Sequence, residues 1–305
     1  LFQLAKKRYL EYGDAEGVAK CNIDIATIYM QFQHHERSLE YFQKGLYSNY
    51  PQIQSKALLG IGQVYEKLGN LDKARKSYEE TVNTIEDRWH DISNDDIRSS
   101  FLTTKFDFYN VLISLCLKQK DFKSALFFIE RLKTRNLMEF LSEKGLEVSD
   151  EENITLDVPD LLDNDSILVE IFPMDDKTVL FLLSKDKDIN NTTIVLTDTD
   201  RFTFSDDIEL VSKAYSEYQD SDETRKQTKQ AEWESFLDKL LKKLHEKIFR
   251  RIEPYLNGIK KIVFVPHALL HIVPLHAMFY EDEEKNRKYV IDEYQVTYAP
   301  SARLY

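Results

Sequence analysis

Residues 260–305 read KKIVFVPHALLHIVPLHAMFYEDEEKNRKYVIDEYQVTYAPSARLY, and this stretch decides the fold of the second half of the chain. The apolar run KIVFV predicts a buried strand, and Pro266 and Pro274 bound a turn with a short apolar segment. A charged loop follows, and residues 289–299 predict a second strand. Two strands preceded by a long helix favour an α/β layer.

Three short apolar runs lie upstream of that helix, beginning at Ser166. They are SILVEIF, TVLFLLS and TTIVLT, each rich in β-branched or aromatic residues and bounded by polar turns. This pattern predicts an antiparallel meander. Two helices are predicted next, over residues 206–219 and 231–255. The second carries apolar residues at helical spacing from Trp233 onward, and Pro254 ends it.

The first half of the chain repeats at an interval of 36 residues. Small and aromatic residues recur in matching order. The pairs are Ala26 and Gly62, Tyr29 and Tyr65, Ser38 and Ala74, and Phe42 and Tyr78. Such a period predicts stacked pairs of antiparallel helices, with small residues where two helices cross. A third pair is predicted over residues 109–132, after an insertion at 84–100.

A connector helix is predicted over residues 125–146, ALFFIERLKTRNLMEFLSEKGL. The next residues, 147–165, are acidic and polar and favour a linker. We therefore predict three parts: helical repeats with the connector helix over 1–146, an acidic linker over 147–165, and an α/β part over 166–305.

The overall charge limits the kinds of ligand. The chain has 41 basic and 53 acidic residues and a formal net charge of −12. An acidic chain is a poor non-specific binder of nucleic acid or of an anionic membrane. No apolar run reaches the roughly 18 residues of a transmembrane helix. Glycines do not cluster between a strand and a helix, so no phosphate-binding loop and no cofactor are predicted.

Residue types suited to catalysis or metal binding do not form a known pattern. His267 and His271 have the i, i+4 spacing of zinc ligands, but Ala268 stands where zinc peptidases have Glu, so no metal is predicted. Cys21 and Cys116 lie in predicted repeat helices, and no cysteine follows Cys116. No G-x-S-x-G motif occurs. No catalytic residue is therefore predicted.

Two surfaces are candidates for binding. The helix over 231–255 carries a basic stripe that could contact RNA or an acidic protein, although a solvated face is the favoured interpretation. The concave face of stacked helical hairpins is their usual contact surface. Residues of the first helices predicted to face it are Lys20, Ile23, Thr27, Lys56, Leu59, Gln63, Asn110 and Ser114. We predict a protein partner there.

Both halves of the sequence resemble known families. The repeated small and aromatic residues resemble the tetratricopeptide repeat (TPR). The blocks VPHALLHIVP and YAPSARLY resemble the opening of a CHAT domain, a caspase-like module, and ERLKTRN resembles the segment that joins the two. The resemblance implies an α-solenoid of TPR hairpins followed by an α/β domain that is the N-terminal, pseudo-caspase-like part of an incomplete CHAT domain. His267 and His271 occupy variable positions of the matching block.

The resemblance also implies a function. CHAT domains are caspase- and separase-like cysteine peptidases with a His–Cys dyad, which in the family follows the blocks matched here. We expect the chain to be the regulatory and scaffolding portion of such a peptidase, with repeats that sense a partner and relay to a catalytic half beyond Tyr305. An RNA-guided effector complex of bacterial, CRISPR-associated defence is one candidate partner. The alternative is a non-enzymatic TPR scaffold with a degenerate CHAT domain. In both cases we expect a cytoplasmic protein without a direct nucleic-acid site or a membrane contact.

Overall fold

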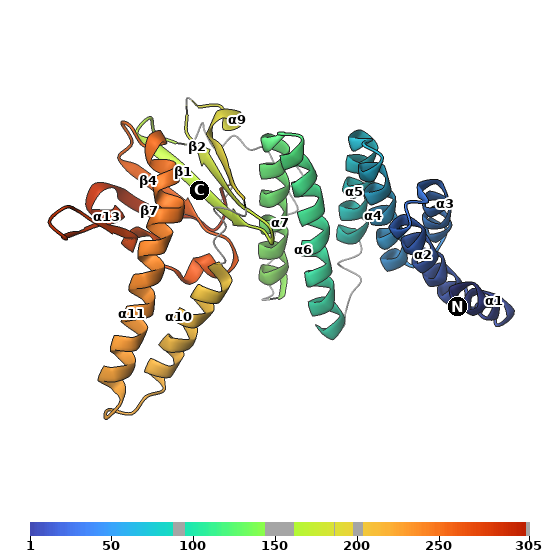
Figure 1. Ribbon diagram of the computed structural model, residues 1–305, viewed down its shortest axis with the longest axis horizontal. Helices are drawn as coiled ribbons and strands as arrows, with labels where there is room; N and C mark the ends of the chain where they lie inside the picture. Colours follow the sequence, from blue (N-terminus) through green and yellow to red (C-terminus); the bar gives the residue numbers. More distant parts are fainter. Residues whose placement is uncertain (88–94, 144–161, 186, 198–203, 303–305) are drawn as a thin grey trace. The chain divides into compact units, whose positions relative to one another are not determined.

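The computed structural model describes residues 1–87, 95–143, 162–185, 187–197 and 204–302. Its chain forms two compact units, Leu1–Phe128 and Ile129–Tyr305 (Figure 1). The predicted linker lies mostly outside the described residues, as do the last residues of the predicted connector helix. The predicted division at 146 and 165 therefore stays a prediction.

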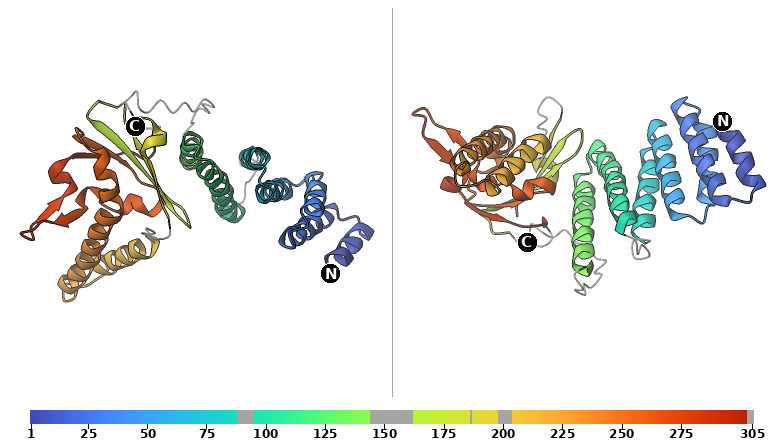
Figure 2. Two further views of the ribbon diagram at one scale, coloured as in Figure 1. Left: turned by 45° about the horizontal axis from the view of Figure 1, so that its top comes forward. Right: turned by 90° about the horizontal axis from the view of Figure 1, so that it is seen from below.

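The first unit is helical throughout its described elements. They are α1 (Phe2–Glu11), α2 (Ala15–Gln31), α3 (His35–Leu46), α4 (Pro51–Lys67), α5 (Leu71–Glu86), α6 (Asp95–Lys118) and the start of α7 (Phe122–Glu143). Helix α2 packs against α3, α3 against α4, α4 against α5, and α5 against α6 (Figure 2). This order confirms the predicted stacking of helical hairpins.

The turns between helices follow from local chemistry. The Asp14 carboxylate accepts a hydrogen bond from the Gly17 N–H at 2.8 Å and so caps the start of α2. At the end of α4, Gly69 has a φ of +76°, a left-handed conformation that glycine adopts without steric cost. Gln33 and Lys120 take the same conformation in the neighbouring turns, at φ values of +60° and +58°. The turn geometry is thus kept in all three hairpins although only one has glycine.

Small residues let helices approach closely, both within a hairpin and between neighbouring hairpins. A Cβ atom on Gly60 would lie 2.3 Å from the Phe42 ring, and one on Gly62 would lie 2.3 Å from the Tyr78 ring. Both rings are almost completely buried. The Ser38 hydroxyl, at a position where the next repeat has Ala, donates a hydrogen bond of 2.8 Å to the Ala26 carbonyl. The buried hydroxyl group therefore has a hydrogen-bond partner where α3 packs against α2.

An arginine joins the second and third hairpins. The Arg75 guanidinium on α5 donates to Asp121 Oδ2 at 2.6 Å, to Ser124 Oγ at 2.8 Å and to Glu79 Oε1 at 2.8 Å. Asp121 and Ser124 lie at the turn that begins α7. This fork of charge-assisted hydrogen bonds fixes the third hairpin against the second.

The second unit is built on a five-stranded sheet. Its strands are β1 (Ser166–Pro173), β2 (Thr178–Leu183), β3 (Thr193–Leu196), β4 (Lys261–Val265) and β7 (Gln295–Tyr298). Their order is β3-β2-β1-β4-β7. The first three strands form the predicted antiparallel meander, while β4 pairs with β1 and β7 pairs with β4 in parallel. The strand-helix-strand order thus gives the predicted α/β layer.

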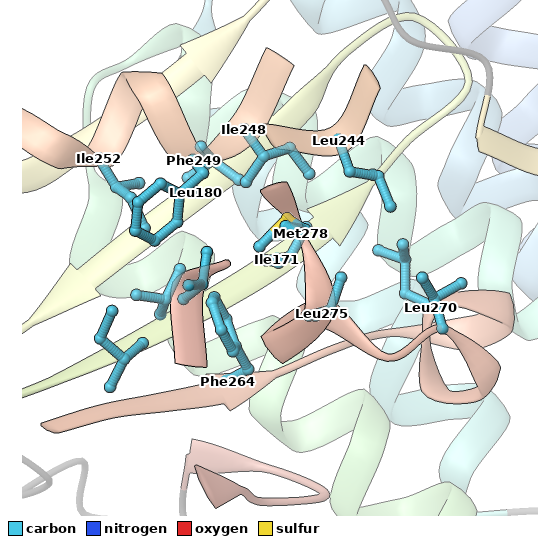
Figure 3. Packing of buried hydrophobic residues seen from close by; sticks show 14 of the residues in the cluster. Ile171, Leu180, Leu244, Ile248, Phe249, Ile252, Phe264, Leu270, Leu275 and Met278 are labelled. Carbon is cyan, nitrogen blue, oxygen red and sulfur yellow. The ribbon is translucent and has the colours of Figure 1, made fainter. Parts of the chain in front are cut away.

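One face of this sheet is covered by the long helical segment that precedes β4. Helix α10 (Phe204–Gln219) packs against α11 (Lys226–Leu244), and α11 continues toward Ile252. Figure 3 shows Leu244, Ile248, Phe249 and Ile252 of this segment over the sheet. They belong to one buried cluster with sheet residues such as Ile171, Leu180 and Phe264.

The long helix differs from the prediction in two ways. It starts at Lys226 instead of Ala231, and its hydrogen bonding changes to a π-helical turn over His245–Phe249 before a short α-helix, Arg250–Ile252. Apolar spacing reports which residues are buried and cannot separate a π turn from an α turn. A 3₁₀ turn over Glu253–Tyr255 ends the segment, because Pro254 lacks the N–H that would continue the α-helix.

The single strand predicted over residues 289–299 is wrong. Arg287–Tyr289 forms β6, which pairs with β5 (Phe279–Glu281), and a helical turn α13 (Val290–Glu293) separates it from β7. The Asp292 carboxylate accepts a hydrogen bond from the Tyr289 N–H at 2.9 Å, which caps this turn. Local capping chemistry therefore interrupts the run of β-favouring residues. The predicted turn before it consists of two 3₁₀ segments, Ala268–Ile272 and Leu275–Ala277.

The close contact between Gly62 of α4 and the Tyr78 ring of α5 predicts the effect of Gly62→Ala. The added methyl group meets the buried Tyr78 ring, so we expect the free energy of unfolding to fall by about 1–3 kcal/mol. Chemical denaturation of the full chain followed by circular dichroism measures this loss. The control is Lys67→Ala, an exposed change on the same helix, which should stay within about 0.5 kcal/mol. An unfolding midpoint for Gly62→Ala at or above that of the wild type would contradict close packing of Gly62 against the Tyr78 ring.

The buried His245 predicts how the stability of the fold changes in acid. Its ring is 1% exposed, lies 5.1 Å from both the Phe249 and Tyr280 ring centroids, and has Nε2 3.9 Å from Glu253. Burial, with a smaller contribution from Arg250, lowers the pKa of His245 from 6.5 to about 4. The unfolded chain therefore binds a proton at a pH where the folded chain does not.

We expect the contribution of His245 to the free energy of unfolding to be constant above the unfolded pKa of about 6.5 and to fall as the pH drops toward about 4. His245→Phe should remove about 1–3 kcal/mol of this pH dependence. Denaturant titrations across that window test the prediction. An identical pH slope in the variant would show that His245 is not the group involved.

Candidate functional site

The predicted partner-binding residues lie on first helices of the hairpins. Lys20, Ile23 and Thr27 of α2 stand 36 residues before Lys56, Leu59 and Gln63 of α4, and so occupy equivalent positions. On α6 the corresponding residues are Asn110 and Ser114. Both lysines are exposed, and the other six residues are half-buried. Their role in binding a partner stays a prediction.

Some of these residues also take part in packing. Thr27 donates a hydrogen bond of 2.9 Å to the Ile23 carbonyl, and Ile23 lies against Gly45 of α3. Lys20 forms an exposed ion pair of 2.6 Å with Glu16. The side-chain oxygen of Asn110 is buried and has no hydrogen-bond partner within the described residues. The first-helix face, defined by Lys20, Ile23, Thr27, Lys56, Leu59, Gln63, Asn110 and Ser114, thus combines cations, amides and apolar groups.

Three lysines of the basic stripe on α11 contact acidic or aromatic side chains. Lys242 pairs with Glu281 at 2.9 Å, and Lys243 pairs with Asp207 at 2.7 Å. The Lys239 ammonium lies 5.7 Å from the Phe236 ring centroid. These contacts support the interpretation of the stripe as a solvated, ion-paired surface.

The histidines that follow β4 make separate contacts. His267 lies 4.7 Å from the Phe172 ring centroid, whereas Nδ1 of His276 lies 2.9 Å from the Tyr298 hydroxyl. Burial lowers the pKa of His267 to about 3, and the charge of Lys133 adds to the effect. Among the residues that the structure describes, no group of three or more His, Cys, Asp or Glu side chains is arranged to hold a metal ion.

A buried charge cluster is the feature that the sequence interpretation missed. On α7, Lys133 donates a hydrogen bond to the Glu170 carboxylate of β1, and its Nζ lies 3.9 Å from Oε1 of Glu130. Both glutamates are 0% exposed and Lys133 is 8% exposed. We call Glu130, Lys133 and Glu170 the connector cluster. One signal was present in the sequence: SILVEIF places a single Glu inside an otherwise apolar strand.

Apolar residues surround the strand side of this cluster. Glu170 is paired across the sheet with Phe181 of β2 and Val265 of β4, and both are completely buried. Phe172 lies two residues along the same strand and so shares its face. The boundary between the two compact units falls inside α7, just before the cluster. The connector cluster therefore joins this helix to the central sheet where the α/β unit begins.

Comparison with known families finds two matches. Residues 55–83, which cover most of α4 and α5, match the tetratricopeptide repeat. Residues 238–305, from the middle of α11 through β4 to β7, match the CHAT domain. No curated protein matches the sequence. The two family matches confirm the predicted order of repeats followed by a CHAT domain. Within the described residues, no helix is long and apolar enough to cross a membrane.

The two thiols generate a prediction about reactivity. Cys21 and Cys116 are buried and free, and burial raises the pKa of both, that of Cys116 to about 12. Because the thiolate is the reactive form, neither should react quickly with a thiol reagent at neutral pH while the chain is folded. Both should react after addition of denaturant. Rapid modification of a cysteine in the folded chain would contradict their structural role.

Proposed function

We propose that this chain, in which a tetratricopeptide repeat is followed by a CHAT domain match, is the regulatory and scaffolding portion of a caspase-like TPR-CHAT cysteine peptidase. Its repeats bind a protein partner, and α7 relays that binding to the α/β unit. Peptide cleavage is assigned to a catalytic half that residues 1–305 do not supply.

The course of α7 is the observation that carries this proposal. The helix begins at Phe122 in the repeat unit and ends at Glu143 in the α/β unit. At its start it is held by Arg75 of the preceding hairpin, and farther along its Lys133 is paired with Glu170 of β1. A displacement of the last hairpin would thus be passed along a continuous helix to the central sheet.

A protein partner agrees better with the surface chemistry than a nucleic acid does. Tetratricopeptide repeats generally mediate contacts between proteins, and the chain has a net charge of −12. The first-helix face offers half-buried Ile23 and Leu59 between exposed Lys20 and Lys56. This mixture suits an acidic or amphipathic protein segment. An RNA-guided effector complex in bacterial defence is one partner of this kind, contacted through its protein part.

The second candidate function is a non-enzymatic scaffold. It shares the repeats and the CHAT match with the first candidate, and takes the CHAT domain to be degenerate. In that case the repeats would hold a partner and the α/β unit would serve as a structural support.

Affinity capture tests the partner-binding surface. We expect the double variant Lys56→Glu, Leu59→Ser to weaken capture of the partner at least about tenfold, a loss of ~1.4 kcal/mol in binding free energy. Lys76→Glu on α5 makes the same charge change away from the first-helix face and should leave capture unchanged. Equal capture by wild type and double variant would contradict binding at this face. Cleavage of a peptide library by the complete natural protein, dependent on the partner, separates the peptidase from the scaffold.

A further inference from the structure

We propose that Asn257, in the turn that leads into β4, is a site of spontaneous covalent modification. Its side-chain amide is lost through attack by the main-chain nitrogen of Gly258, and the products are aspartate and isoaspartate. The reaction needs no enzyme and no reagent other than water. This inference does not depend on the proposed function, because it rests on the chemistry and the surroundings of one turn.

Asn257 is the only asparagine of the chain that is followed by glycine. The main-chain nitrogen of the following residue is the nucleophile in this reaction, and a side chain on that residue hinders its approach to the asparagine amide. Glycine has no side chain, and its main chain rotates with the least restriction. The sequence therefore removes at Asn257 the steric barrier that protects the other asparagines.

The turn that holds this pair lies at the surface. The Ile259 N–H donates a hydrogen bond of 2.9 Å to the Leu256 carbonyl, so Asn257 and Gly258 are the two central residues of a β-turn. Both are exposed, and Gly258 has a φ of +80°. A Cβ atom added to Gly258 would have no heavy atom of the described chain within 4 Å. The surroundings therefore leave room for the peptide group between the two residues to rotate.

Other contacts do not hold the reacting groups. Within the described residues, the Asn257 side chain makes no hydrogen bond and the Gly258 N–H has no acceptor. Two other exposed asparagines are held: Asn70 accepts a hydrogen bond of 3.2 Å from the Lys73 N–H, and Asn286 donates one of 3.2 Å to a neighbouring carboxylate. Attack at Asn257 requires only that the single turn bond opens, and hydrogen bonds in exposed turns open at low cost.

The chemistry balances with water alone. The Gly258 nitrogen gives its proton to a base in the solvent and forms a bond to Cγ of Asn257. The bond from Cγ to Nδ2 breaks, and the amide nitrogen takes up a proton and leaves as ammonia. Water then opens the cyclic imide at either of its carbonyl carbons. Opening at Cγ yields aspartate, and opening at the main-chain carbonyl yields isoaspartate, in which the main chain runs through the side-chain carbons.

Isoaspartate lengthens the main chain directly before the central sheet. It adds one carbon atom between Leu256, which is buried in the core, and Ile259, which packs against the same core. The Lys260 and Lys261 N–H groups donate to the Asp165 carbonyl at 2.8 and 3.1 Å and fix the start of β4 beside β1. Because both ends of the turn are anchored, the extra carbon disrupts the turn bond and loosens the entry to β4.

Peptide mapping of the full chain tests the site. The folded protein is kept in a mildly alkaline buffer and digested with trypsin at intervals. Cleavage on both sides of the turn releases residues 252–260, in which Asn257 is the sole amide side chain. We expect this peptide to convert into two acidic products of identical mass. The conversion should be at least about tenfold faster than at Asn70 or Asn286, a difference of ~1.4 kcal/mol in activation free energy.

Asn257→Gln is the matched variant, because its longer side chain closes a ring much more slowly and the position is exposed. Its map should show no conversion of residues 252–260 over the same interval. Conversion of the wild-type peptide only after addition of denaturant would overturn the proposal, since the folded turn would then protect Asn257. Equal rates at Asn257, Asn70 and Asn286 would overturn it as well.

Hydrogen exchange tests the structural consequence. The isoaspartate form of the full chain is compared with fresh Asn257→Asp, which carries the same charge without the extra carbon. We expect the amides of residues 259–261 to exchange faster in the isoaspartate form, while exchange in the repeat unit stays the same. Identical exchange at residues 259–261 in the two proteins would show that the longer main chain does not loosen the entry to β4.

Discussion

The contact between Lys133 of α7 and Glu170 of β1 is the constraint on which the organisation of this chain depends. A charged pair in an apolar interior is costly to bury, and it persists only where the fold holds both partners in place. Here the central strand supplies one partner and the helix that comes from the repeats supplies the other. Because the two residues are 37 apart in sequence, the pair also fixes how the connector returns to the sheet.

Each unit contributes contacts that hold its own part of α7. In the repeats, Gly60 and Gly62 admit the rings of Phe42 and Tyr78, and Arg75 fastens the turn from which α7 starts. In the α/β unit, one side of the sheet is occupied by the long helical segment before β4 (Figure 3). The opposite side chains of β1, including Glu170 and Phe172, are equally buried. Lys133 of α7 is therefore bonded to a strand whose side chains are buried on both faces of the sheet.

Much of the architecture could be predicted from sequence, because periodic patterns report which side chains are buried. The 36-residue interval predicted the helical hairpins, and the apolar runs predicted the strands β1 to β4. Interruptions by local hydrogen bonding were missed, since Asp292 caps a turn inside a run that favours a strand. The connector cluster was missed for another reason: Glu130, Lys133 and Glu170 meet only after the helix and the strand pack, and the spacing of the residues does not encode that register.

A double-mutant cycle on Lys133 and Glu170 tests the central claim most directly. If the pair is buried and coupled, Lys133→Met alone should lower the free energy of unfolding by about 3–5 kcal/mol, because it leaves Glu170 without its cation. The double variant Lys133→Met, Glu170→Leu should then recover at least ~1 kcal/mol relative to the sum of the single changes. Strictly additive losses, or single changes without effect, would show that α7 is not held to the sheet by this pair.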